Sequence, residues 1–277
     1  MTSHTQSVLE FNSADADIFL NVEDSSNQKR RFAVHKCILS AASPFFRDMF
    51  SLPQPSAAQA TELDIPSIDM PESADVLYTL LQYIYPVPNP VPNPIILSLG
   101  KLVPVLEAAE KYDILVAVDS LRKQLVSTEN LTEDPLRIYA IASRYDLQEE
   151  IKVAAKYTLK KNVLDCPLSD DLKHITAYDY HRLLDLHRRH VHATRQAFIQ
   201  LERVTVQDHK CSVWWWSRYE KAAKLELAQR PSTDVIFSRP FISSCVTWCH
   251  DCHASVYLTL PDLERVKEDI DALPFMV

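Results

Sequence analysis

The sequence predicts an α+β protein in which a few short strands near the N-terminus precede a long, mostly helical region. Residues 17–22 alternate apolar and polar side chains, as in a half-buried strand. Most later segments instead repeat apolar residues every three or four positions, which is the period of an amphipathic helix. The 277-residue chain holds one glycine and 17 prolines. This composition favours helices joined by proline-containing turns over a large sheet with tight hairpins.

The densest apolar segment, residues 32–50, indicates the end of a second strand followed by two short helices. Ser43-Pro44 predicts where the second of these helices begins, because serine is a favoured N-cap and proline fits the first helical turn. Aromatic side chains follow at helical spacing and indicate a core element rather than a catalytic site. We expect the following residues to form the structural core: His35, Phe45, Phe46, Met49, Phe50 and Tyr112.

Further elements follow in order along the chain. Residues 61–65 are a candidate strand, and a helix is expected from about Pro71 to Tyr85. Prolines alternate over residues 86–94, which predicts an extended, exposed loop because proline cannot pair within a central strand. Helices resume at Leu102. One long amphipathic helix is predicted from this stripe of residues: Leu184, His187, Val191, Thr194, Phe198 and Leu201.

These patterns divide the chain into four parts: a disordered N-terminus at 1–13, a domain at 14–127, a helical extension at 128–205, and a C-terminal module at 206–277 rich in cysteine, histidine and tryptophan. A last helix is expected over residues 263–273. The N-terminus has no basic-then-apolar secretion signal, and no apolar run is long enough to span a membrane. We therefore expect an intracellular protein, cytoplasmic or nuclear or both.

Charge and motifs argue against two classes of function. The net charge of −8 disfavours general nucleic-acid binding, although residues 135–230 carry 17 Lys and Arg against 12 Asp and Glu. We interpret that basic excess as a solvated helical face. A single glycine excludes the glycine-rich loops that bind phosphates and dinucleotides. No nucleophile elbow and no His-Glu-x-x-His motif is present, so the sequence does not predict an enzyme.

Four of the six cysteines follow residue 210, and two of them form a Cys-x-x-Cys motif at Cys249 and Cys252. This spacing lets two thiolates bind one tetrahedral zinc ion, which needs a second pair of ligands from elsewhere in the chain. Cys211 is the upstream candidate. The predicted structural zinc ligands are Cys211, Cys249, Cys252 and His253, with Cys245 or His209 as alternatives. A second interpretation is that these residues are reduced thiols packed among the tryptophans.

Several of these segments together resemble the BTB/POZ domain. The strand at residues 17–22 leads to a strand that ends in His35-Lys36, and the family's Leu-Ser-x-x-Ser-x-x-Phe-x-x-Met-Phe pattern is matched by residues 39–50. Residues 80–85 are similar to the family's Leu-x-Tyr-Ile-Tyr helix end. Residues 106–114 are similar to its Leu-x-Ala-Ala-x-Lys-Tyr-x-Leu helix. The three matches occur in the family's order.

The resemblance implies a small sheet flanked by a cluster of helices and a function in protein–protein interaction. It implies homodimerisation and binding of a cullin scaffold, as in adaptors that recruit substrates to a ubiquitin ligase. It places Asp17 and Lys36 near the dimer groove, although Asp17 is equally compatible with a cap of the strand turn. The alternative is a nuclear transcription or chromatin-linked regulator that uses the domain for self-association.

The C-terminal part resembles a fungal type of BTB protein. In that type, cysteines flank a double tryptophan, and a Pro-Ser-Thr step precedes a second cysteine pair. The matching residues here are Cys211, Trp214-Trp215, residues 231–237, and Cys249 with Cys252. The resemblance therefore implies that the Cys/Trp-containing extension belongs with the N-terminal domain.

Overall fold

The computed structural model describes residues 11–23, 29–52, 65–85, 96–205, 210–245, 247–249 and 254–256, and residues 264, 267–268 and 270–272 near the C-terminus. The chain divides into two compact units, residues 1–127 and 128–277, which are considered one at a time. Within the described ranges, no helix has the length and apolar character needed to cross a membrane.

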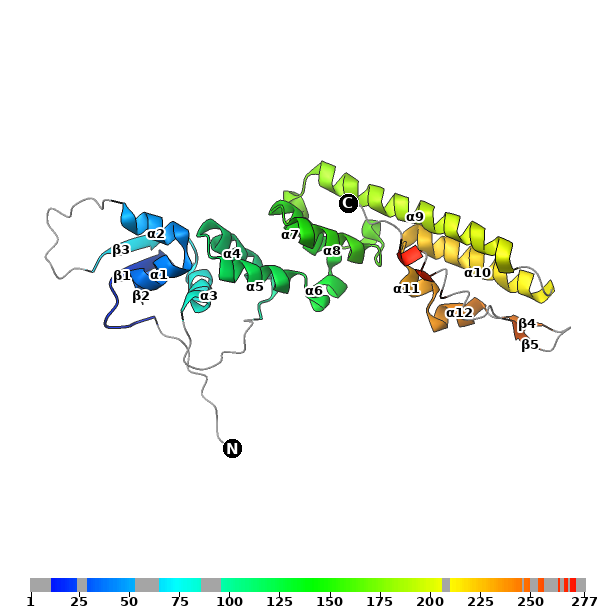
Figure 1. The fold of residues 1–277 in the computed structure, drawn as a ribbon, viewed down its shortest axis with the longest axis horizontal. Coiled ribbons are helices and arrows are strands. Elements are labelled where there is room, and N and C mark those ends of the chain that lie inside the picture. Colours follow the sequence, from blue (N-terminus) through cyan, green and yellow to red (C-terminus); the bar gives the residue numbers. More distant parts are fainter. Residues whose placement is uncertain are drawn as a thin grey trace, which may run out of the picture. The chain divides into compact units, whose positions relative to one another are not determined.

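The first unit is built on a three-stranded sheet with the order β2-β1-β3 (Figure 1). Strands β1 (Ile18–Glu23) and β2 (Lys29–Val34) are antiparallel, and β3 (Ser67–Met70) joins β1 in parallel. The side chains of Ile18, Leu20 and Val22 are buried, as the alternating sequence predicts. We expected a strand at residues 61–65. This prediction is wrong for Ile65, which lies just before β3 and is not in a strand, and residues 61–64 are outside the described part.

Five helices of this unit are described: α1 (Lys36–Ala42), α2 (Pro44–Ser51), α3 (Ala74–Ile84), α4 (Leu99–Lys111) and α5 (Leu115–Leu125). The predicted start of α2 is confirmed, because the Ser43 hydroxyl accepts a hydrogen bond from the Phe46 N–H at 3.1 Å. Ser73 caps α3 in the same way. Helix α3 ends before Tyr85, as expected. The alternating prolines at 86–94 lie outside the described residues.

The N-terminal boundary differs from the prediction. Residues 11–13 belong to the ordered unit: Asn12 forms a parallel bridge with Ala33, and the Phe11 carbonyl accepts a hydrogen bond from the Ala33 N–H at 2.8 Å. Phe11 is also buried. Because residues 1–13 are mostly polar and show no apolar period, the sequence did not indicate that Phe11 is buried. Residues 1–10 are outside the described part.

The second unit begins with a short helix α6 (Thr128–Glu133) and a helical pair, α7 (Pro135–Arg144) and α8 (Gln148–Thr158), which pack on each other. Asp134 caps α7 through a hydrogen bond from the Arg137 N–H at 3.1 Å. Two short 3₁₀ turns follow, η1 (Val163–Asp165) and η2 (Asp170–His174). They lead into the longest helix of the described part, α9 (Ala177–Thr205).

Helix α9 confirms the predicted long amphipathic helix, and it lies beside α10 (Lys210–Gln229) (Figure 1). Tyr219 of α10 is fully buried, and its hydroxyl donates to the Ile236 carbonyl at 3.0 Å. That contact fastens α11 (Thr233–Ile236), which α12 (Arg239–Cys245) follows. Strands β4 (Thr247–Cys249) and β5 (Ala254–Val256) form an antiparallel ladder. Residues 264, 267–268 and 270–271 are helical, within the last predicted helix.

Candidate partner-binding surface

Asp17 and Lys36 meet at the start of helix α1. Asp17 is exposed just before β1, and its Oδ1 accepts a hydrogen bond from the backbone N–H of Lys36 at 2.7 Å. The first N–H groups of a helix have no partner within it, and a carboxylate there also offsets the positive end of the helix dipole. Asp17 thus caps α1 from a different segment. The contact joins the Asp17 carboxylate to the backbone of Lys36, so the Lys36 ammonium group takes no part in it.

His35 links the same corner to the end of α3. Its backbone N–H donates to the Tyr85 hydroxyl at 2.7 Å, and its Nδ1 lies 3.2 Å from that oxygen. Its Nε2 lies 3.3 Å from Asp15 Oδ1. Burial raises the pKa of Tyr85 to about 12, so the phenol stays protonated. Hydrogen bonds from Ser13 and then His35 lower the pKa of the Asp15 carboxyl. His35 is half-buried and acts as a connector.

An aromatic cluster that the sequence did not predict supports this corner. The Phe11 ring lies at 6.1 Å from Phe32, 5.7 Å from Tyr78 and 5.2 Å from Tyr85, measured between ring centroids. All three contacts are edge-to-face, the arrangement that aromatic quadrupoles prefer. Tyr85, noted in the sequence only as a helix end, therefore holds both Phe11 and His35 in place.

A second cluster joins α2 to α4 through Tyr112. Ser43 donates its hydroxyl proton to the Tyr112 carbonyl at 2.5 Å, and the Tyr112 hydroxyl donates to Glu72 Oε2 at 2.5 Å. The other Glu72 oxygen pairs with Lys111 Nζ at 2.7 Å. Burial, followed by the Glu72 hydrogen bond, raises the pKa of Tyr112. Tyr112 is therefore a buried anchor of the helical cluster, and Glu72 is a partner that the sequence did not reveal.

The prediction that Phe45 lies in the core is wrong. Phe46 occupies the buried position at 1% exposure and stacks on Tyr112, whereas Phe45 remains 41% exposed. Both rings lie 5.3 Å from the Tyr112 ring, but consecutive residues point about 100° apart on a helix, and here Phe46 takes the inward direction. Met49 and Phe50 are half-buried. Leu52, the residue directly after α2, is 63% exposed, so apolar side chains face solvent at both ends of this helix.

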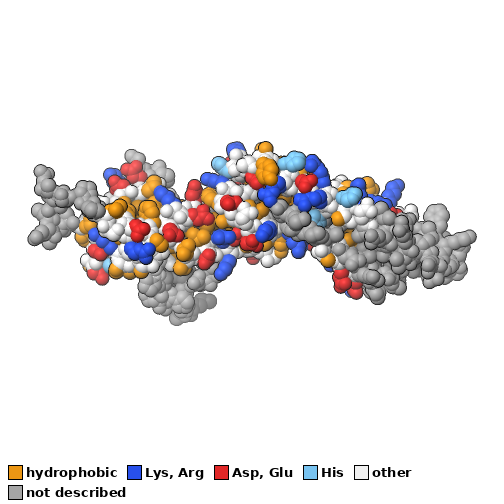
Figure 2. Space-filling model, turned by 45° about the horizontal axis from the view of Figure 1, so that its top comes forward, with side chains coloured by type: hydrophobic (Ala, Val, Ile, Leu, Met, Phe, Trp, Pro, Cys, Tyr) orange, Lys and Arg blue, Asp and Glu red, His pale blue; other side chains and the backbone are white. Residues whose placement is uncertain are grey.

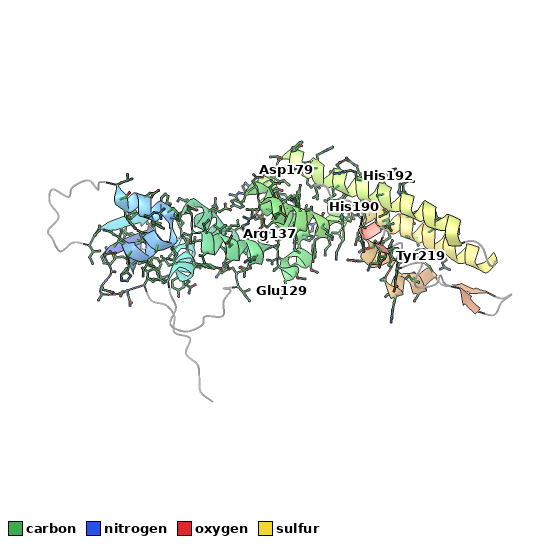
Figure 3. The ribbon with its side chains drawn as sticks, viewed as in Figure 1. Glu129, Arg137, Asp179, His190, His192 and Tyr219 are labelled. Carbon is green, nitrogen blue, oxygen red and sulfur yellow. The ribbon has the colours of Figure 1, made fainter. Side chains whose placement is uncertain are left out.

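In the second unit, polar contacts fasten η2 and α9 to the helices α7 and α8 before them (Figure 3). The buried Tyr139 of α7 donates its hydroxyl to the Asp179 carbonyl at 2.8 Å, and Arg137 pairs with Asp171 at 2.6 Å. The Thr158 hydroxyl of α8 lies 3.0 Å from His187 Nε2. Burial, followed by the nearby His190, lowers the pKa of His187 to about 4. The His187 imidazole is therefore neutral at pH 7.

The predicted zinc ligands fall mostly outside the described part of the chain. This applies to His209, Cys252 and His253, and to the side chains of Cys211 and Cys249. Cys245 is buried at the end of α12. On the backbone, Cys249 ends β4 and pairs with Ala254 of β5. Among the side chains that are described, no group of three or more His, Cys, Asp or Glu could hold a metal ion.

Comparison with known families identifies the first unit. Residues 9–129 match the family model of the BTB/POZ domain. No curated protein matches the chain. The matched segment contains the three-stranded sheet, the capped pair α1–α2, and the Tyr112 anchor. The chain therefore carries a BTB/POZ domain, a protein–protein interaction module, at residues 9–129.

Proposed function

We propose that this chain is a dimerising BTB/POZ adaptor that recruits substrate proteins to a cullin-type ubiquitin ligase. In this proposal the BTB/POZ domain binds a second copy around Asp17 and Lys36, and another of its surfaces binds the cullin scaffold. The second unit then recruits the protein to be modified.

The observation that carries the proposal is the pair of exposed apolar side chains at the two ends of α2. Phe45 in the first turn of the helix is 41% exposed, and Leu52, the residue directly after the helix, is 63% exposed. Exposed apolar side chains with polar residues around them are typical of protein–protein contacts. Arg47 and Asp48 are also exposed beside them and supply a polar rim.

Cullin binding is tested by capture of the full chain on a purified cullin N-terminal region. We expect the wild type to bind and the double variant Phe45→Ser/Leu52→Ser to lose at least tenfold in affinity. Ile96→Ser is the matched control, because Ile96 is 83% exposed and lies outside α2. Equal binding by the two variants would reject the role of Phe45 and Leu52 in cullin binding. An absence of wild-type binding would reject cullin binding itself.

Self-association is tested separately by sedimentation equilibrium. The proposal expects a mass near twice 31.7 kDa. Lys36→Glu should weaken the dimer because it reverses a charge beside the proposed contact, whereas Lys29→Glu on the exposed start of β2 should not. A monomeric wild type at micromolar concentration would reject the dimer.

The alternative proposal is a nuclear transcription or chromatin-linked regulator. It uses the same self-association and is supported by the basic excess at 135–230. A dimer that binds no cullin but shifts duplex DNA in a salt-dependent manner would favour this function.

We also propose that the C-terminal module binds one structural zinc ion. The antiparallel β4–β5 ladder supports this proposal, because it pairs Cys249 with Ala254 along the backbone, and the sequence between these two residues contains Cys252 and His253. Two thiolates at Cys-x-x-Cys spacing suit tetrahedral zinc. Native mass spectrometry with and without a chelator should differ by one zinc, and Cys249→Ser should remove that difference. Identical masses would reject the site.

A further inference from the structure

The second unit carries a groove of about 480 Å³. It lies outside the BTB/POZ match, and none of its described lining residues is a predicted zinc ligand. One wall is the middle of α9, and the opposite side is formed by residues 162–164, the end of α10 and Pro231. The volume lies within the range of sites that bind ligands or peptide side chains. All of these elements belong to the same compact unit.

Half of the described lining residues of the groove are apolar: Val163, Leu164, Leu184, Val191, Ala228 and Pro231. The sequence predicted that Leu184 and Val191 would belong to the buried stripe of α9. The structure instead buries Leu183 and Leu186 and leaves Leu184 and Val191 partly exposed in the groove. Across from them, Leu164 is 76% exposed. The groove therefore presents apolar side chains to solvent on both sides.

Its rim is cationic. Arg188, His192 and Arg195 line the groove and are exposed on one face of α9. Neighbouring arginines on the same helix are paired: Arg182 with Asp179, and Arg189 with Asp185 at 2.9 Å. Arg188 and Arg195, in contrast, form no ion pair within the part of the chain that the structure describes, and no Asp or Glu is among the described lining residues. Figure 2 shows Lys, Arg and His side chains on the second unit, with Asp and Glu side chains among them.

We propose that this groove binds a short acidic segment of a partner protein, in which apolar side chains lie between carboxylates. The apolar side chains would contact Leu164, Leu184 and Val191, and the carboxylates would pair with the two arginines. A guanidinium binds a carboxylate through two parallel hydrogen bonds, so two such pairs fix the position of the segment and align it along α9.

The spacing of the arginines sets the length of the segment. Arg188 and Arg195 are separated by about 10 Å along the helix axis, at about 1.5 Å per residue. An extended segment covers that distance in about three residues. A peptide with two acidic residues three positions apart and apolar residues between them therefore fits the groove. No Phe, Tyr or Trp is among the described lining residues, so the groove lacks the stacking platforms typical of single-stranded nucleic-acid sites.

This inference rests on the adaptor proposal, because it names the surface of the second unit that recruits the partner. It needs neither self-association nor cullin binding. The dimer and cullin experiments can therefore fail while peptide binding succeeds. In the opposite outcome, the dimer and cullin experiments succeed and peptide binding fails, which would reject this inference alone.

The test uses the full chain and a random peptide library displayed on phage. We expect the selected peptides to be rich in Asp and Glu around an apolar residue. Synthetic, fluorescently labelled copies of the selected peptides should bind in an anisotropy assay. The double variant Arg188→Glu/Arg195→Glu should weaken that binding by tenfold or more, and raised salt should weaken it as well.

Two matched controls keep the test specific. Arg218→Glu/Lys221→Glu makes the same change of charge at exposed positions of α10 outside the groove and should leave binding unchanged. Leu164→Ser should reduce binding, whereas Leu168→Ser should not, because Leu168 is 91% exposed but does not line the groove. Circular dichroism checks that each variant is folded.

Three results would overturn the proposal. One is selection of peptides without acidic enrichment. Another is equal weakening by the groove variant and the α10 variant. The third is that no selected peptide binds, while a single-stranded RNA oligonucleotide binds the wild type and not the Arg188→Glu/Arg195→Glu variant. That result would assign the arginines to a phosphate backbone.

Discussion

The two units end a helix with the same turn, and they use it differently. Residues 111–114 read Lys-Tyr-Asp-Ile after α4, and residues 144–147 read Arg-Tyr-Asp-Leu after α7. Asp113 and Asp146 both adopt the left-handed conformation, with φ of 51° and 54°. In each turn the next N–H bonds a carbonyl five residues back at 2.9 Å, which closes the helix end. Aspartate here takes the place that glycine usually holds.

The tyrosines of the two turns have different surroundings. Tyr112 is 3% exposed and donates to Glu72, whereas Tyr145 is only half-buried. In the second unit a different polar group is partly buried, the His187 imidazole beside Thr158 at the far end of α8. The comparison teaches that local sequence encodes the turn, whereas the tertiary surroundings decide what the turn anchors. The following predictions test that difference.

The largest effect is expected at the tyrosines. Tyr112→Ala should cost about 3–5 kcal/mol of unfolding free energy, since it removes a buried ring, and Tyr145→Ala should cost clearly less. Hydrogen exchange of the α4–α5 segment reports on the first unit. Tryptophan fluorescence reports on the second, because all four tryptophans follow residue 213. Equal losses at the two positions would contradict the difference in anchoring.

The second unit should be the acid-sensitive one. The pKa of His187 is about 4 in the folded state, against an ordinary value of 6.5. Between these values the unfolded chain binds more protons, so stability is full above pH 6.5 and falls as pH drops toward 4. We expect a loss of about 1–2 kcal/mol between pH 7 and 5 in urea unfolding followed by tryptophan fluorescence.

His187→Gln is the variant that tests this assignment. Glutamine can still form a hydrogen bond with Thr158 but does not titrate, so the pH dependence should become shallower. His190 also has a lowered pKa through burial, so some dependence should remain. An unchanged slope in His187→Gln would show that other groups carry the acid sensitivity.

The shared turn itself should respond equally in both units. Asp113→Val and Asp146→Val should each cost about 1–2 kcal/mol, because a β-branched residue is strained at positive φ. Glycine at the same positions should be tolerated, since it adopts this conformation without a Cβ clash. The two units are followed by hydrogen exchange and fluorescence as above. A cost at only one of the two sites would mean that the turns are not equivalent.

The smallest effect is expected at the exposed leucines, one in each unit. Leu52→Ser and Leu164→Ser should each change the unfolding free energy by no more than about 0.5 kcal/mol, as is usual for surface positions. Thermal unfolding measures this directly. Both substitutions should nevertheless reduce partner binding. A large loss of stability in either variant would reassign that leucine from a binding surface to the core.

Local signals in the sequence predicted much of the fold. Ser43-Pro44 located the start of α2, and the family pattern located the BTB/POZ domain, because caps and apolar periods act within a few residues. The parallel strand β3 was placed too early, since its position depends on pairing with β1 rather than on its own four residues. Phe45 and Phe46 are indistinguishable by type, and tertiary packing decides which ring is buried: both contact Tyr112, yet Phe46 is buried and Phe45 is exposed.

The groove on α9 escaped prediction for a related reason. The apolar stripe at 184 and 191 was visible, but its neighbours Leu183 and Leu186 are equally apolar, and the packing of α7, α8 and α10 selects which pair faces inward. The helical period fixes the existence of a buried face, and the direction of that face is fixed by contacts distant in the sequence.

Phe11 has a practical consequence for how the BTB/POZ domain is prepared. A truncated protein that starts at residue 14, the boundary suggested by the sequence pattern, would lack this ring and the Phe11 carbonyl that binds the Ala33 N–H. Phe32, Tyr78 and Tyr85 would then lose their shared neighbour, and apolar ring surface would face water. Poor solubility of such a fragment would reflect the choice of its first residue rather than an unstable domain.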